Sequence, residues 1–190
     1  MILYLHGFRS SPQSFKARLL GEYLQRQGRS ADTLLQQLPA SPREAIAMAL
    51  QLTAGLDPAA LTIIGSSLGG FYATWLAEHI GCRAVLLNPA VAAPDDLQKY
   101  VGVTTQFHSD QVFEFKAEYV DELRALTVPN ITRPSRYFLL AATGDEVLNW
   151  RDMVAHYPGA KQHIIDGSDH GISDFADYID AVLAFCAQSA

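Results

Sequence analysis

Short apolar runs alternate with helix-like segments along this chain, and this alternation restricts its fold more than any other feature. Most of the runs are apolar at every position, as in the strands of a parallel sheet that is covered on both faces. The six predicted strands are residues 2–5, 33–38, 61–64, 84–87, 137–142 and 162–165. We therefore predict an α/β fold with a mostly parallel sheet of about six strands, right-handed crossovers and helices on both faces.

The segments between the predicted strands carry helix signals. Ser-Pro-Arg-Glu at 41–44 offers an N-cap, a proline at the first helical position and a capping-box glutamate. Further helices are expected around 15–24, after Ser67, at about 150–157 and at about 173–188. The length of 190 residues and the apolar share of 49% suit one domain with a sizeable core.

The charge balance limits the partners of the chain. Fourteen Lys and Arg residues against twenty Asp and Glu residues give a net charge of -6. Such an acidic chain is a poor match for nucleic acid or for an anionic membrane surface, so neither is expected as a partner. No apolar run could span a bilayer and no secretion signal follows Met1, so we expect a cytoplasmic protein. Cys82 and Cys186 form neither a metal-ligand spacing nor a disulfide framework.

Two serines stand between glycines directly after the predicted strand at 61–64. The sequence Gly-Ser-Ser-Leu-Gly at 65–69 fits the pattern G-x-S-x-G at a strand-to-helix turn, where a strained elbow exposes a serine hydroxyl above the sheet. The residues two before and two after that serine must be small, because strand and helix close on each other there. Only Ser67 has glycine at both positions, so Ser67 is the candidate nucleophile.

A nucleophilic serine needs a base and a carboxylate that orients the base. His170 lies just past the last predicted strand, where the chain turns toward the final helix. Asp145 follows the predicted strand at 137–142 and a turn glycine, at the carboxyl edge where ligand sites of open α/β sheets gather. The candidate nucleophile, acid and base are therefore Ser67, Asp145 and His170 in chain order. Other candidates for the acid are Glu146, Asp95 and Asp96.

His6 and the remaining polar groups near the site have other expected roles. His6 lies in Leu-His-Gly-Phe at the end of the first strand, so we expect it to brace that loop while the backbone N–H of Phe8 points into the site. His163, Asp166 and His170 stand on no helix or hairpin that would bring all three together, so no metal site is predicted.

Four stretches of the sequence resemble a known family. They are "YLHGFRSSPQSFKA" at 4–17, "GSSLGGFYATW" at 65–75, "NPA" at 88–90 and "TGDEVLNW" at 143–150. Together with the order of the three candidate residues, they resemble the α/β-hydrolase superfamily over the whole chain, and within it the YqiA-type small bacterial esterases. The chain lacks the first two strands of a full-length hydrolase sheet, which leaves an edge that must be covered or paired.

The resemblance implies a fold, a substrate class and a set of site residues. It implies that aryl esters and acyl-CoA thioesters are hydrolysed by a triad of Ser67, Asp145 and His170. It also implies that the backbone N–H groups of Phe8 and Leu68 form the oxyanion hole.

The segment at 94–134 interrupts the alternation of strands and helices. It has no strand-like run, and two helices are predicted in it, at 95–101 and 116–126, joined by aromatic-rich sequence. Inserts of this length in compact enzymes are often lids or binding loops. We therefore predict a single α/β-hydrolase domain over residues 1–190 with a small helical cap insert at about 94–134.

Both ends of this insert lie at the edge of the sheet that carries Ser67, so the cap is expected to cover the site. Its aromatic and aliphatic side chains are more apolar than a solvated loop requires, which is typical of a binding surface. Phe107 and Phe113 are the predicted pocket residues.

These features predict a serine hydrolase that uses a Ser-His-Asp triad and an acyl-enzyme intermediate, without a cofactor. Its partner would be a small-molecule ester or thioester, and it would act as a carboxylesterase or an acyl-CoA thioesterase. The sequence does not indicate the oligomeric state. Two alternatives remain, a nucleotide-binding α/β module that uses the glycine-rich turn at 65–70 and a catalytically silent binding protein with the hydrolase fold.

Overall fold

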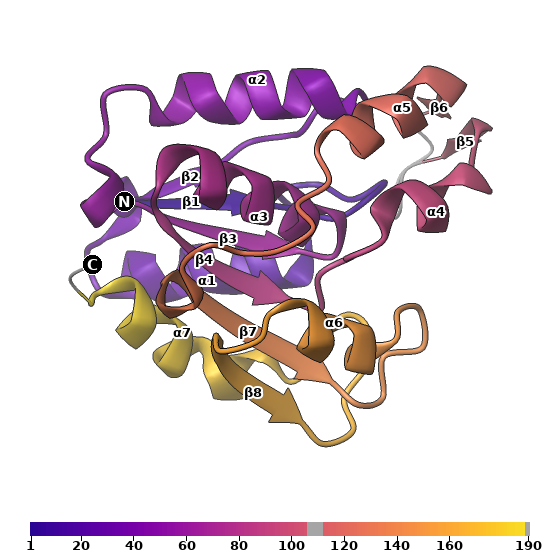
Figure 1. The fold of residues 1–190 in the computed structure, drawn as a ribbon. Helices are drawn as coiled ribbons and strands as arrows, with labels where there is room; N and C mark the ends of the chain where they lie inside the picture. Colours follow the sequence, from indigo (N-terminus) through magenta and orange to yellow (C-terminus); the bar gives the residue numbers. More distant parts are fainter. Residues whose placement is uncertain (106–111, 189–190) are drawn as a thin grey trace.

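A six-stranded parallel sheet forms the centre of the computed structural model, which describes residues 1–105 and 112–188 (Figure 1). The strands lie in the order β2-β1-β3-β4-β7-β8, and every neighbouring pair is parallel. Their bounds are β1 (Ile2–Leu5), β2 (Thr33–Leu35), β3 (Thr62–Ser66), β4 (Arg83–Leu87), β7 (Tyr137–Ala142) and β8 (Lys161–Ile165). The predicted α/β fold with a parallel sheet of six strands is confirmed.

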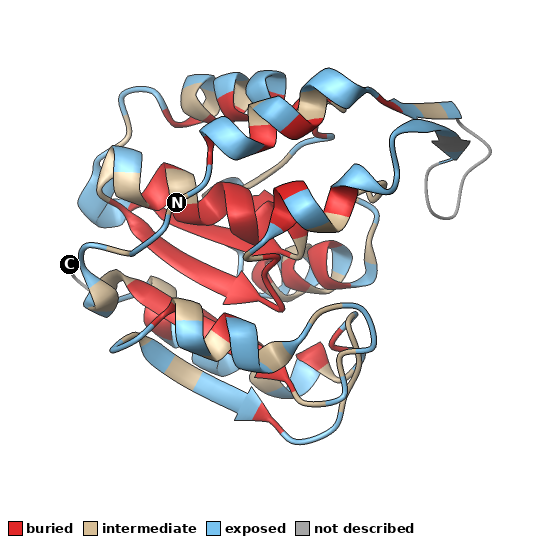
Figure 2. Cartoon of the chain, turned by 45° about the vertical axis from the view of Figure 1, so that its right-hand side comes forward, coloured by how far each residue is buried: buried red, intermediate tan, exposed pale blue. Residues whose placement is uncertain are grey.

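The burial of each strand follows from its sequence. Every residue of β1, β3, β4 and β7 is buried, because these strands are covered on both faces and are apolar at nearly every position (Figure 2). The edge strands differ from them: β2 is half-buried and β8 is largely exposed. The most apolar strands therefore occupy the middle of the sheet.

Helices cover both faces of the sheet. One face packs against α1 (Phe15–Arg26) and α7 (Ile179–Cys186), and the other against α2 (Pro42–Thr53), α3 (Leu68–Ile80) and α6 (Trp150–His156). Neighbouring residues of β1 alternate between the two cores, with Leu3 on the α3 side and Tyr4 on the α1 side. The predicted start of α2 is confirmed, because the Ser41 hydroxyl accepts a hydrogen bond from the backbone N–H of Glu44.

The insert contains two short helices and an antiparallel hairpin. These elements are α4 (Ala93–Gln98), β5 (Gly102–Thr105), β6 (Val112–Phe115) and α5 (Ala117–Ala125). The prediction that the insert has no strand is therefore wrong. In β6 the side chains of Val112 and Glu114 are exposed while those of Phe113 and Phe115 turn inward, a two-residue alternation that is too short to stand out in the sequence.

The insert lies at the end of the sheet to which the strands point (Figure 1). Its helix α5 is fixed to the start of α2 by Glu122, whose carboxylate accepts hydrogen bonds from the Ser41 hydroxyl at 2.7 Å and from the Arg43 N–H at 3.0 Å. Residues 106–111, which include the predicted pocket residue Phe107, lie outside the described residues. Within the described residues, no helix is both long enough and apolar enough to cross a membrane.

Candidate active site

Ser67 occupies a strained turn between β3 and α3. Its backbone angles are φ 55° and ψ -121°, a region that residues other than glycine rarely adopt. Backbone hydrogen bonds hold this conformation. The Ser67 N–H donates to the Leu87 carbonyl at 3.0 Å, and the Ser67 carbonyl accepts from the N–H groups of Ala90 and Gly70 at 3.0 and 2.9 Å. The position of the serine is therefore fixed by main-chain hydrogen bonds.

The glycines around Ser67 allow three backbones to meet. A Cβ atom on Gly65 would lie 2.2 Å from the carbonyl oxygen of Gly69, and one on Gly69 would lie 2.0 Å from that of Leu5. Contacts this short are impossible for any residue with a side chain. The close approach of β1, β3 and α3 thus explains why glycine stands on both sides of Ser67 at the predicted spacing.

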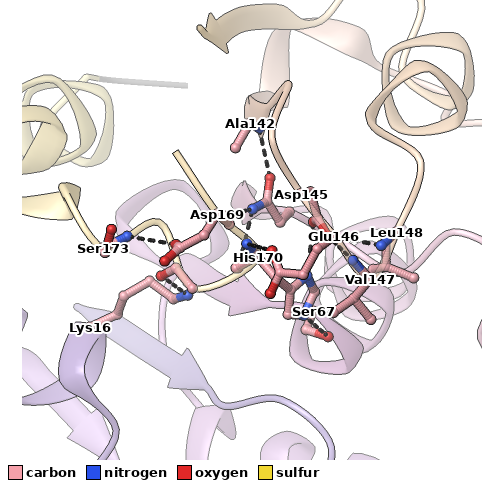
Figure 3. A network of polar contacts seen from close by, with 12 residues as sticks. Lys16, Ser67, Ala142, Asp145, Glu146, Val147, Leu148, Asp169, His170 and Ser173 are labelled. Carbon is pink, nitrogen blue, oxygen red and sulfur yellow. Dashed lines mark hydrogen bonds and ion pairs between the residues drawn. The ribbon is translucent and has the colours of Figure 1, made fainter. Parts of the chain in front are cut away.

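The structure brings together the three residues that the sequence singles out (Figure 3). The Oγ atom of Ser67 lies 3.1 Å from Nε2 of His170, and Nδ1 of His170 lies 2.8 Å from Oδ2 of Asp145. The side chain of Asp145 is completely buried, whereas that of His170 is 22% exposed. A carboxylate beside Nδ1 favours the tautomer with its proton on Nδ1, so Nε2 is left to accept the proton of the serine hydroxyl.

Asp145 is itself held in place by the backbone that follows it. Its second oxygen, Oδ1, accepts hydrogen bonds from the N–H groups of Val147 and Leu148, both at 2.8 Å. The carboxylate therefore has three donors around it when the Nδ1–H of His170 is included. This arrangement aims Oδ2 at the imidazole ring.

The other candidate acids do not contact the imidazole ring in the part of the chain that the structure describes. Glu146 accepts a hydrogen bond from the backbone N–H of His170 at 2.9 Å, so it holds the main chain and not the ring. Asp95 and Asp96 lie in the first turn of α4. Burial raises the pKa of Asp96, which lines the cavity beside Ser67. Of the four candidates, only Asp145 contacts the imidazole ring of His170 among the described residues.

His6 supports the loop after β1. It is almost fully buried, its Nε2 atom accepts a hydrogen bond from the N–H of Leu38 at 3.0 Å, and its Nδ1 atom lies 2.9 Å from the Gly7 carbonyl. Burial also lowers its pKa. Neutral His6 therefore fixes this loop, which is the role expected from its place in the sequence.

Phe8 and Leu68 are the two residues predicted to offer backbone N–H groups to a substrate at Ser67. Both line the same cavity as Ser67 and His170. Leu68 is the first residue of α3, so its N–H has no partner within the helix. Neither N–H donates a hydrogen bond to another group among residues 1–105 and 112–188. Both N–H groups are thus available to a ligand at Ser67.

The cavity beside Ser67 has a volume of about 200 Å³. It is lined by Phe8, Arg9, Ser67, Leu68, Ala90, Asp96, Leu97, Lys99, Tyr100, Val147, Leu148 and His170. The predicted pocket residue Phe113 packs edge-to-face against Phe8, with ring centroids 5.3 Å apart, and lies one layer behind this wall. In the described part of the chain, no group of three or more His, Cys, Asp and Glu side chains could hold a metal ion.

Asn88 is a residue of the site that sequence reasoning missed. It is completely buried, has φ 43°, and follows β4 directly. Its amide nitrogen donates to the carbonyls of Asp169 and His170 at 3.0 and 3.1 Å, and its amide oxygen accepts from the N–H of Ala142 at 2.8 Å. Asn88 therefore joins the ends of β4 and β7 to the loop that carries His170. A polar residue at the carboxyl end of an apolar strand was the available signal.

Asn88→Ala is expected to lower the free energy of unfolding by roughly 2–4 kcal/mol, because it removes the partners of the buried Ala142 N–H and of the His170 carbonyl and one of the two donors to the Asp169 carbonyl. It should also lower kcat, because the loop of His170 loses one of the side chains that hold it. Asn88→Asp is the informative companion, since it keeps the acceptor for Ala142 and removes the donor to the loop. Urea unfolding and ester turnover would measure the two effects. Normal turnover by Asn88→Asp would show that the loop does not depend on this amide.

Comparison with known proteins identifies the family and the fold of the chain. A family model described as "Uncharacterised protein family (UPF0227)" matches residues 1–187. Alpha/beta hydrolase domain-containing protein 10 from mouse superimposes with a TM-score of 0.71 at 15% identity, over 96% of this chain and 89% of that one. Est1E from Butyrivibrio proteoclasticus, solved with ferulic acid bound, gives 0.69 at 15% identity over 98% and 89%.

A third solved structure is similar to this chain over a comparable length. The esterase domain of a Rhodothermus marinus protein gives a TM-score of 0.69 at 18% identity, over 97% of this chain and 85% of that one. At these identities the likeness shows the fold, which is that of the α/β-hydrolases. Because the family model matches residues 1–187, the chain belongs to the UPF0227 family, the YqiA-type family that its sequence motifs resemble.

Proposed function

We propose that this protein is a serine hydrolase that cleaves carboxylic esters or acyl-CoA thioesters through an acyl-enzyme on Ser67. The observation that carries the proposal is the hydrogen-bonded series from the Ser67 hydroxyl through both nitrogens of His170 to the buried carboxylate of Asp145. A serine, a histidine and an acid in this arrangement activate the hydroxyl as a nucleophile.

The first half of the reaction forms the acyl-enzyme. His170 Nε2 takes the proton of the Ser67 hydroxyl as Oγ attacks the carbonyl carbon of the substrate. The tetrahedral intermediate then expels the alcohol or thiol, which leaves with the proton that His170 has carried. In the second half, a water molecule gives its proton to His170 and attacks the acyl carbon, which releases the acid and restores the Ser67 hydroxyl.

The negative charge on the carbonyl oxygen needs donors during both halves. Phe8 and Leu68 line the same cavity as Ser67, and their N–H groups donate to no other group in the described residues, so we assign the oxyanion hole to them. Each such donor contributes on the order of 3 kcal/mol to the stability of the transition state.

The acyl group would occupy the cavity beside Ser67. Its volume of about 200 Å³ is smaller than the roughly 300–1,000 Å³ of pockets that enclose drug-sized ligands, which favours short acyl groups. Phe8, Leu97 and Leu148 supply an apolar lining for them. The insert, as the cap that we propose, contributes Leu97 and Tyr100 to this wall, and Phe113 supports it from behind.

A panel of aryl esters and acyl-CoA thioesters with increasing acyl length would test the function. We expect kcat/KM to rise about fourfold per added methylene, since each contributes about 0.8 kcal/mol when buried, until the cavity is full. Ser67→Ala, run beside the wild type, should show no turnover above background. No turnover of any ester or thioester, together with a rise in melting temperature on adding nucleotides, would support a nucleotide-binding module instead.

A further inference from the structure

Lys16 is a buried lysine below the candidate active site. It lies on α1, is 8% exposed, and its Nζ atom donates a hydrogen bond to the carbonyl of Gly171 at 2.5 Å (Figure 3). In the described part of the chain no carboxylate lies close enough to form a salt bridge with it. Within residues 1–105 and 112–188, its hydrogen-bond partner is thus the backbone next to His170.

Burial of the charged ammonium of Lys16 costs free energy of folding, because the group loses its hydration. Burial lowers its pKa from 10.5 to about 8, although attraction to the carboxylates of Asp169 and Asp145 acts in the opposite direction. On the neighbouring strand β1, Tyr4 stays neutral because burial raises its pKa. The lysine is therefore charged near neutral pH, is attracted by two carboxylates with which it forms no salt bridge, and opposes folding through the loss of its hydration.

The backbone around His170 is held from three directions. Glu146, after β7, accepts from the N–H of His170 at 2.9 Å, and Asn88, after β4, donates to the carbonyl of His170 at 3.1 Å. Lys16 donates to the next carbonyl, that of Gly171. Three side chains from three separate elements thus fix consecutive main-chain groups on both sides of one imidazole ring.

We propose that Lys16 is a positioning residue for the reaction: its ammonium holds the Gly171 carbonyl, next to His170, and thereby keeps the imidazole ring in line with Ser67. This inference rests on the proposed function. In this role Lys16 determines the position of the His170 ring and does not stabilise the fold. Lys16 touches neither the substrate nor the reacting atoms.

Lys16→Met should lower kcat for a short aryl ester by on the order of 10²-fold with KM within about twofold, because a small misplacement of the base slows chemistry without changing ground-state binding. Its melting temperature at pH 7 should stay within a few degrees of the wild type, because removal of a buried charge offsets the lost hydrogen bond. Arg18→Met is the matched control, since it removes an exposed cation from the same helix and should change neither quantity.

The pH dependence separates this role from a structural one. The pKa of Lys16 is lower in the folded than in the unfolded chain, so between about pH 8 and 10.5 the unfolded chain binds more protons and stability rises with pH. Over the same range kcat of the wild type should fall as the ammonium loses its charge. The fall in kcat and the rise in melting temperature should both be absent from Lys16→Met.

The proton NMR signal of the Nδ1–H of His170 reports on its hydrogen bond to Asp145 and can be measured without substrate. We expect a resolved downfield signal in the wild type and a broadened or missing one in Lys16→Met, with the Arg18→Met spectrum unchanged. An identical signal in Lys16→Met, or kcat within twofold of the wild type from pH 7 to 10, would overturn the positioning role. A wild type that turns over no ester would refute the proposed function, while the NMR comparison would still decide whether Lys16 positions the ring.

Discussion

Ser67→Ala is expected to lower kcat for a short aryl ester by on the order of 10⁶-fold, because the remaining groups cannot form an acyl-enzyme. The hydroxyl that is removed lies 3.1 Å from Nε2 of His170, at the point where β3 turns into α3. The fold should be unaffected, since the hydrogen bonds that hold the turn are made by the backbone of this residue. A fluorophosphonate should add once to the wild type, at Ser67, and intact mass spectrometry would show it.

The neighbouring serine provides the matched control. Ser66 is buried within β3, and its hydroxyl interacts with Tyr4 on the α1 side of the sheet. Ser66→Ala should therefore keep its turnover and still accept one adduct. An adduct that maps to Ser66, or that persists in Ser67→Ala, would show that the elbow has been assigned to the wrong residue.

The sheet could be predicted from the sequence because local signals and tertiary structure agree in it. The runs at Ile2–Leu5 and Tyr137–Ala142 are apolar at nearly every position and become fully buried strands with the predicted bounds. The glycines around Ser67 carry a similarly direct signal, because a Cβ atom at Gly65 or Gly69 would overlap a neighbouring backbone.

The hairpin of the insert could not be predicted in the same way. β5 and β6 have four residues each, and the described part of β6 is buried on one side only. The sheet they form contains only these two strands, so no long apolar run marks it. Its position depends instead on aromatic contacts with Phe8, which is more than 100 residues away from Phe113 and Phe115 in sequence.

Asn88 and Lys16 show why some contacts around His170 could not be predicted from the sequence. Their hydrogen bonds to the loop of His170 span 82 and 155 positions of the chain. A polar residue after a strand and a lysine on a helix are common features, and only the fold places both against the same loop. Long-range contacts of this kind leave no local periodicity from which to infer them.

The choice between Asp145 and Glu146 also depended on the fold. Both acids follow β7, and adjacent positions in a turn can point their side chains in different directions. In the structure Asp145 reaches the ring of His170, while Glu146 reaches its backbone N–H. The two residues therefore support the same histidine in different ways, which makes their substitutions a matched pair.

Asp145→Asn is expected to lower kcat by on the order of 10⁴-fold, because an amide in place of the carboxylate neither stabilises the imidazolium nor selects the tautomer with the proton on Nδ1. KM should change little, since Asp145 does not line the cavity beside Ser67. The fold should persist, because the amide oxygen of asparagine can still accept hydrogen bonds from the N–H groups of Val147 and Leu148. Steady-state kinetics and circular dichroism would measure these effects.

Glu146→Gln should reduce kcat far less, because the amide oxygen of glutamine can still accept the hydrogen bond from the backbone N–H of His170. The ranking of the two variants is therefore the decisive quantity, since both remove one negative charge from neighbouring positions. A larger loss in Glu146→Gln than in Asp145→Asn would reassign the acid. A comparable loss in Asp95→Asn or Asp96→Asn would transfer that role to α4, where Asp96 lines the cavity beside Ser67.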